Sequence, residues 1–199
     1  MSITLSSLRS RLNNTLNDPN STIWSATVKD QAINAGIARL YPFNFLEKTD
    51  TTQTTDTDAP TFLYTTPSDC ENLCQVFIAN VATDPKIAVV PWTWYGATSQ
   101  VELRYIEKYY DAKTITMLYE AAHPQLATDN ATLDPQTKED VAIEAVLYWA
   151  KLQCWEVKDR QNIGKIELAD YLNLQKWYYG QFGELLRRCT MPRIPIINF

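Results

Sequence analysis

The stretch Val141–Val157 reads VAIEAVLYWAKLQCWEV, and it is apolar on nearly every side of a helix. The apolar run is interrupted at only four positions, which are Glu144, Lys151, Gln153 and Glu156. A helix of this kind has to be covered on several faces. The sequence therefore predicts a helical bundle around it, completed either by its own domain or by a neighbouring subunit.

The residues on both sides of this stretch predict where helices begin and end. Asp134 is suited to cap a helix and Pro135 to its first turn, so we expect a helix over residues 135–158. After a polar turn, a second helix is expected over residues 165–188. Its apolar stripe consists of Leu168, Leu172, Tyr179, Phe182 and Leu186.

Two more helices are expected at the front of the chain. Leucines spaced three and four residues apart predict the first over residues 4–17, at Leu5, Leu8, Leu12 and Leu16. A second is expected over residues 25–41, where Ser25 is a good N-cap and Pro42 ends the helix.

The middle of the chain has a different periodicity. Residues 47–61 lack apolar periodicity and are rich in threonine, so we expect a solvated loop there. Short β-branched and aromatic runs follow over residues 62–120, and Val101 and Leu103 alternate with Glu102 and Arg104. The predicted fold is α+β. It is a predominantly helical bundle of about four helices, with a small antiparallel β-sheet inserted between the second and third, in a single domain of residues 1–190.

Composition argues against several classes of function. The net charge is −5, which disfavours a protein that wraps nucleic acid, and no Gly-rich phosphate loop is present. The single histidine, His123, precedes a proline and is expected in a loop. The four cysteines, Cys70, Cys74, Cys154 and Cys189, are expected to be free thiols, because no secretion signal is visible. We predict no catalytic residue, bound metal, cofactor or membrane span.

Two groups of residues are candidates for binding other proteins. The tail, residues 191–199, is apolar and contains two prolines, so we expect it to dock on another chain or to fold back over its own sheet. Its candidate contacts are Met191, Arg193, Ile194, Ile196, Ile197 and Phe199. Core packing or a subunit interface could account for a second set, consisting of Trp149, Trp155, Trp177 and Tyr178 with the basic pair Arg187 and Arg188.

Several motifs occur in an order that matches a known family. SLRSRLN at residues 7–13 is followed by TIWSATVKDQAINAGIARLYP at residues 22–42. LYTTPSD at residues 63–69 and YEAAHPQL at residues 119–126 flank the predicted sheet, and Asp134-Pro135 opens the apolar helix. This order resembles that of the head-to-tail adaptor, or connector, proteins of tailed bacteriophages.

The resemblance implies a ring, commonly of twelve copies, in the neck of the virion, made in the host cytoplasm. Its partners would be the portal protein, further copies of itself and the adjacent tail or stopper protein. DNA would pass non-specifically through the lumen, and a ring of twelve would carry a formal charge of about −60. The alternatives are another neck component (a head-completion or tail-terminator protein), a cellular binding module, and a small enzyme with carboxylates at Glu102, Glu107 and Asp111.

Overall fold

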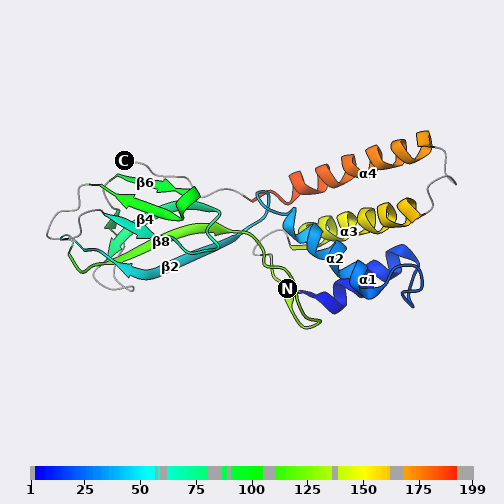
Figure 1. Ribbon diagram of the computed structural model, residues 1–199, viewed down its shortest axis with the longest axis horizontal. Helices are drawn as coiled ribbons and strands as arrows, with labels where there is room; N and C mark the ends of the chain where they lie inside the picture. The colour runs from blue at the N-terminus through cyan, green and yellow to red at the C-terminus, as the bar shows by residue number, and fades with distance from the viewer. Residues whose placement is uncertain are drawn as a thin grey trace. The chain divides into compact units, whose positions relative to one another are not determined.

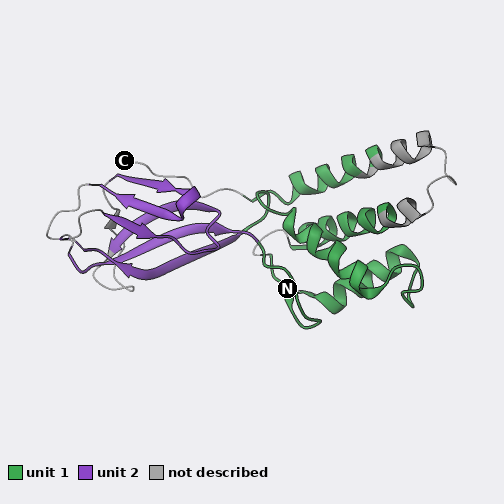
Figure 2. Cartoon of the chain, in the orientation of Figure 1, with its two compact units in different colours: residues 1–45, 123–191 green, residues 46–122, 192–199 purple. Residues whose placement is uncertain are grey.

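The protein folds into two compact units. The structure is a computed structural model that describes residues 3–56, 58, 62–79, 87–88, 91–104, 111–135, 139–161 and 168–191. In its helices and strands, the side chains of residues 79, 87–88, 157–161, 168–175 and 178 are outside the description. Unit 1 comprises Met1–Phe45 and His123–Met191, and unit 2 contains Leu46–Ala122 (Figure 2).

Unit 1 contains the four α-helices of the described chain, which confirms the predicted α+β class with four helices. These are α1 (Leu5–Leu16), α2 (Ala26–Ala38), α3 (Glu139–Gln161) and α4 (Leu168–Arg188) (Figure 1). The side chain of Thr4 caps α1 by accepting from Ser7 N–H, and that of Ser25 caps α2 by accepting from Val28 N–H.

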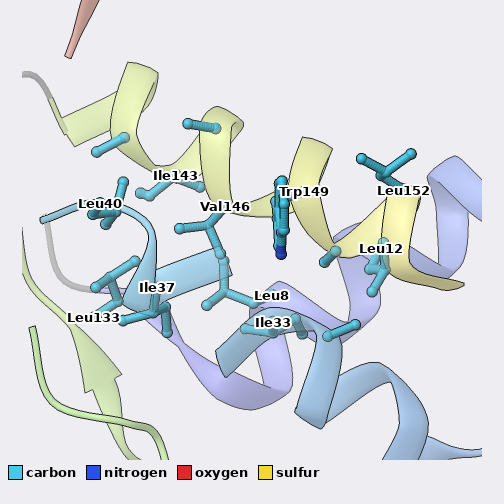
Figure 3. Packing of buried hydrophobic residues seen from close by; sticks show 14 of the residues in the cluster. Leu8, Leu12, Ile33, Ile37, Leu40, Leu133, Ile143, Val146, Trp149 and Leu152 are labelled. Atoms are coloured by element: carbon cyan, nitrogen blue, oxygen red, sulfur yellow. The ribbon is translucent and has the colours of Figure 1, made fainter. Parts of the chain in front are cut away.

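The core of unit 1 forms where α1 and α2 pack against α3 (Figure 3). The predicted leucine stripe of α1 faces the core, since Leu5, Leu8, Leu12 and Leu16 are all buried. The nearly all-round apolar α3 contacts α1, α2 and α4, so helices of its own unit cover it. The sequence left open whether this helix is covered by its own domain or by a neighbouring subunit, and in the structure its own domain covers it.

Unit 1 also contains a short two-stranded sheet that the predicted fold did not include. Strand β1 (Ile3–Thr4) precedes α1 and pairs antiparallel with β9 (Thr132–Leu133), which precedes α3. The sheets of the described chain are therefore three in number, and one of them uses residues from before the first helix.

Unit 2 consists of two antiparallel sheets that share one apolar core. The larger has the order β2-β8-β4-β5, with β2 (Leu46–Thr54), β8 (Thr114–Ala121), β4 (Asn72–Ala79) and β5 (Ile87–Ala88). The smaller has the order β3-β7-β6, with β3 (Leu63–Thr65), β7 (Gln100–Leu103) and β6 (Trp92–Tyr95). Between the sheets lie the buried residues Tyr64, Leu73, Val76, Val101, Leu103, Ile115, Met117, Tyr119 and Ala121. The predicted alternation around Val101 and Leu103 is confirmed, since both are buried and Arg104 is exposed.

The prediction of a solvated loop at residues 47–61 is wrong for its first half. Residues 46–54 form strand β2, which pairs along β8 with an irregularity between Asp50 and Gln53. Threonine is β-branched and favours extended backbone, and an edge strand with mostly exposed side chains needs no apolar alternation. The threonine content that suggested a loop is therefore a strand signal here.

The expected start of the third helix is also wrong. Helix α3 begins at Glu139, whereas Asp134 and Pro135 precede it as irregular backbone. Pairing of β9 with β1 holds the chain extended up to Leu133, just before these two residues. Glu139 and Asp140 do lie in the first turn, where the helix dipole favours carboxylates. Helix α2 ends at Ala38, before the predicted boundary at Pro42.

Candidate interaction surfaces

The turn between α1 and α2 is built around a buried ion pair. Lys29 Nζ lies 2.9 Å from Asp18 Oδ2, and both side chains are fully buried. Asp18 also accepts hydrogen bonds from the backbone N–H groups of Thr22, Ile23 and Trp24. Three consecutive residues before α2 are therefore bound to one carboxylate, which fixes the way the chain enters α2.

The electrostatics of this turn follow from its contacts. Burial by itself would raise the pKa of Asp18, but hydrogen bonds from Lys29 and the backbone lower it well below its usual range. Trp24 extends the arrangement toward α3 by donating from Nε1 to the carbonyl of Cys154 at 2.6 Å. The turn and the far half of α3 are thereby held together.

A second polar cluster gathers residues from three distant parts of unit 1. His123 Nε2–H donates to Asn44 Oδ1 at 2.9 Å, and Asn44 Nδ2 donates to the carbonyl of Cys189 at 3.3 Å. His123 is only 6% exposed, and burial lowers its pKa to about 4. The expected loop histidine is thus buried and neutral near pH 7, with its ring held by an amide.

The first residue of the predicted tail belongs to the core of unit 1. Met191 is 4% exposed; its backbone N–H donates to the carbonyl of Phe43 at 2.8 Å, and its sulfur accepts from Phe45 N–H. Met191 therefore offers no accessible surface for docking on another chain. The other proposed tail contacts lie outside the described residues: Arg193, Ile194, Ile196, Ile197 and Phe199.

The tryptophans expected in core or interface have different environments. Trp149 of α3 is 8% exposed, and its ring centroid lies 4.7 Å from that of Phe182 and 5.8 Å from that of Tyr179. Trp155 is half-buried and stacks edge-on against Trp24 at 5.5 Å. Both rings therefore pack inside their own unit.

The outer side of α4 carries residues that were expected in an interface and that are exposed. Trp177 is 57% exposed, and Arg187 and Arg188 at the end of the helix are exposed as well. The side chain of Tyr178 is outside the described residues. Sequence reasoning thus singled out residues of α4 whose exposure is consistent with an interface.

The family of the protein is given by comparison with family models. The model for the SU10 adaptor protein family matches residues 3–190. The chain belongs to the SU10 adaptor family. This is a family of phage head-to-tail adaptors, as the order of motifs suggested, and the match includes both units. A comparison with curated proteins finds no match to the chain.

Membership in the SU10 adaptor family implies a phage protein that interacts with other capsid and tail proteins, in the neck of the virion. Among the helices of the described residues, none is long and apolar enough to span a membrane. The described residues also contain no group of three or more His, Cys, Asp or Glu side chains that could hold a metal ion.

The carboxylates considered for an enzymatic site can be followed in part in this SU10 adaptor. Glu102 is half-exposed on β7 and accepts from Tyr95 O–H at 2.8 Å. Asp111 is exposed in a turn, and Glu107 lies outside the described residues. The buried carboxylates of the adaptor were not singled out from the sequence, because a pattern of residue types does not reveal burial of Asp18 or Glu120.

All four cysteines of the adaptor are free thiols. Cys154 on α3 is fully buried, and burial raises the pKa of its thiol to about 11. Burial also raises the pKa of Cys70, to about 12, with smaller contributions from neighbouring acidic groups. A protonated thiol is a poor nucleophile, so neither side chain has the chemistry of a reactive cysteine.

Proposed function

We propose that this adaptor forms a ring in the neck of a tailed phage, bridging the portal to the next tail or stopper component while DNA passes through its lumen. The observation that carries the proposal is the family match over residues 3–190. The net charge of −5 supports it, because an acidic channel wall repels the phosphate backbone and lets DNA slide.

Electron microscopy of the purified protein, alone and mixed with purified portal rings, tests this proposal. We expect closed rings of the adaptor, commonly of twelve copies, either free in solution or seated on one end of the portal. A chain that stays monomeric at high concentration and also fails to bind the portal would overturn the proposal.

We propose further that the C-terminal tail beyond Met191 docks on another chain of the neck. The support is the composition of residues 192–199, in which Ile194, Ile196, Ile197 and Phe199 are large and apolar. Buried on a partner, each such side chain would contribute roughly 1.5–3 kcal/mol.

Deleting residues 192–199 tests the docking proposal more cleanly than deleting residues 191–199, because Met191 is part of the core of unit 1. We expect the shorter deletion to leave the melting temperature of the monomer unchanged and to abolish joining of heads to tails. Loss of the folded monomer would instead assign the tail to the protein's own core. A matched control, Met191→Ala in the full-length chain, should lower the melting temperature.

A further inference from the structure

Three glycines lie in the described helices of unit 1, and within the described residues only Gly36 has a close neighbour that explains why a side chain is absent. A Cβ on Gly36 of α2 would lie 2.8 Å from the carbonyl oxygen of Val146 on α3, so this glycine lets the two helices approach closely. A Cβ on Gly180 or Gly183 of α4 would meet no atom within 4 Å. Glycine lowers helix stability relative to alanine, and nothing in the described chain compensates at these two positions.

Gly180 belongs to the outer side of α4. With 3.6 residues per turn, Trp177, Gly180, Glu184 and Arg187 fall on one side of the helix. The opposite side carries Phe182 and Leu186, which are buried in the core of unit 1. The outer side thus combines an exposed tryptophan, a glycine, Glu184 and the basic pair Arg187 and Arg188, so its end is basic and its glycine permits close approach of another helix.

A surface of opposite charge lies on α3. Asp140 and Glu144 are one helical turn apart and both are exposed. Within the described part of the chain, neither carboxylate makes an ion pair, and neither Arg187 nor Arg188 makes one. Both the basic and the acidic surface are therefore available to a partner.

The two surfaces lie at the same level of the helix pair. Trp149 contacts Phe182, and Glu156 accepts from the Tyr179 hydroxyl at 3.0 Å, so α3 and α4 run antiparallel (Figure 1). Continuing this register toward the start of α3 brings Glu144 level with Arg187. A rotation about an axis parallel to the helices would therefore move one surface next to the other in a neighbouring copy.

We propose that the outer side of α4 in one copy packs against α3 of the next copy, with Arg187 and Arg188 facing Asp140 and Glu144. The contact is heterologous, joining two different surfaces, which is the kind that closes into rings. The inference rests on the proposed ring and names the surface that builds it. The occupant of the α4 surface is a second copy of this chain, because the complementary charges lie on the chain itself.

Charge reversal in two variants tests this pairing. Variant A carries Arg187→Glu and Arg188→Glu, and variant B carries Asp140→Lys and Glu144→Lys. We expect each variant alone to need at least about tenfold higher concentration to assemble than the unmodified protein. An equimolar mixture of A and B should recover assembly, because each reversed surface then meets its complement. Native mass spectrometry, with and without portal rings, gives the stoichiometry.

Substitutions of the glycines separate packing from folding. Gly180→Leu should leave the helical content intact and raise the melting temperature of the monomer by about 2–4 °C. The same variant should fail to form rings. Gly36→Leu is the matched control, expected to lower the melting temperature because its side chain would strike Val146.

The outcomes distinguish this inference from the proposed function. If the unmodified protein forms rings and both variant A and Gly180→Leu assemble equally well, the α4–α3 contact is wrong and the ring proposal stands. If variant A forms rings but no longer binds portal, the partner of α4 is the portal and the inference is wrong. If the unmodified protein never assembles, even on portal rings, the proposed function itself fails.

Discussion

The two units of this adaptor bury charged side chains in opposite ways. In unit 1, Asp18 and Lys29 are fully buried, and between them they bind each other, three backbone N–H groups, a carbonyl and polar side chains. In unit 2, Glu120 on β8 is also fully buried, yet neither of its carboxylate oxygens has a hydrogen-bond partner within the described structure.

The two sites differ in their expected effect on stability: the carboxylate of Asp18 contributes to the fold of unit 1, whereas the carboxyl group of Glu120 destabilises unit 2. A buried ion is tolerated when its partner and its hydrogen bonds replace the lost water, as they do at Asp18. Glu120 lies opposite Glu47 of β2 and Asn72 of β4 in the pairing register, so its cross-strand neighbour is another acid. The turn of unit 1 should therefore be sensitive to loss of its charge, and β8 should tolerate the loss.

The largest effect is expected from Lys29→Met. This change keeps the length of the side chain but leaves Asp18 buried without its cation. Breaking a buried pair from one side costs about 3–5 kcal/mol. Guanidinium denaturation followed by circular dichroism at 222 nm, which reports the helices of unit 1, measures the loss.

The double variant Asp18→Asn with Lys29→Met is the control for this prediction. It removes both charges, so part of the lost stability should return. If the single and double variants are equally unstable, the ion pair contributes nothing beyond packing, and the proposed role of the charge is wrong.

The helices were predictable because their signals are local. The spacing of Leu5, Leu8, Leu12 and Leu16 and the capping residue Ser25 are properties of a few neighbouring residues, and the structure uses all of them. The start of α3 was misplaced because it depends on pairing between β1 and β9, whose residues are far apart in the sequence.

The sequence could not reveal which polar side chains are buried or which residues they bind. Nothing in the residue pattern around Lys29 distinguishes it from an exposed lysine, since its partner Asp18 precedes the helix. Leu46 is the only apolar residue of β2, so the strand has no apolar alternation by which the sequence could mark it. For the candidate interface, the sequence singled out Trp177 and Arg187, whereas the significance of Gly180 required knowing that its surroundings are open.

The next effect in size concerns the pH dependence set by His123. Its pKa is about 4 in the folded protein and 6.5 unfolded, so between these values the unfolded chain binds the additional proton. The stabilising contribution is fully present above pH 6.5 and is lost as the pH falls toward 4, by about 3 kcal/mol at most. Thermal unfolding measured between pH 7 and pH 4 gives the slope.

His123→Gln serves as the control, because a glutamine amide can still donate to Asn44 but does not titrate in this range. Its stability should be nearly flat between pH 6.5 and 4. The contribution of Asp18, whose pKa is lowered, is present above about pH 4 and disappears only below it, so both proteins should lose stability there. Identical slopes in the wild type and His123→Gln would contradict the assignment.

The smallest effect is a gain, expected from Glu120→Met in β8. Methionine has a similar length and removes a carboxylate that is buried without a hydrogen bond, and it also removes the acidic neighbour of Glu47. Replacing a buried carboxyl group that lacks a hydrogen-bond partner with an apolar side chain should stabilise unit 2 by about 1–2 kcal/mol. Hydrogen–deuterium exchange of peptides covering β8 reports this unit separately, and slower exchange is expected. Glu102→Gln on β7, where the carboxylate is half-exposed and bonded to Tyr95, is the matched control and should not slow exchange in β8. Faster exchange in Glu120→Met would mean that the acid is needed in the folded sheet, and the contrast between the two units would no longer hold.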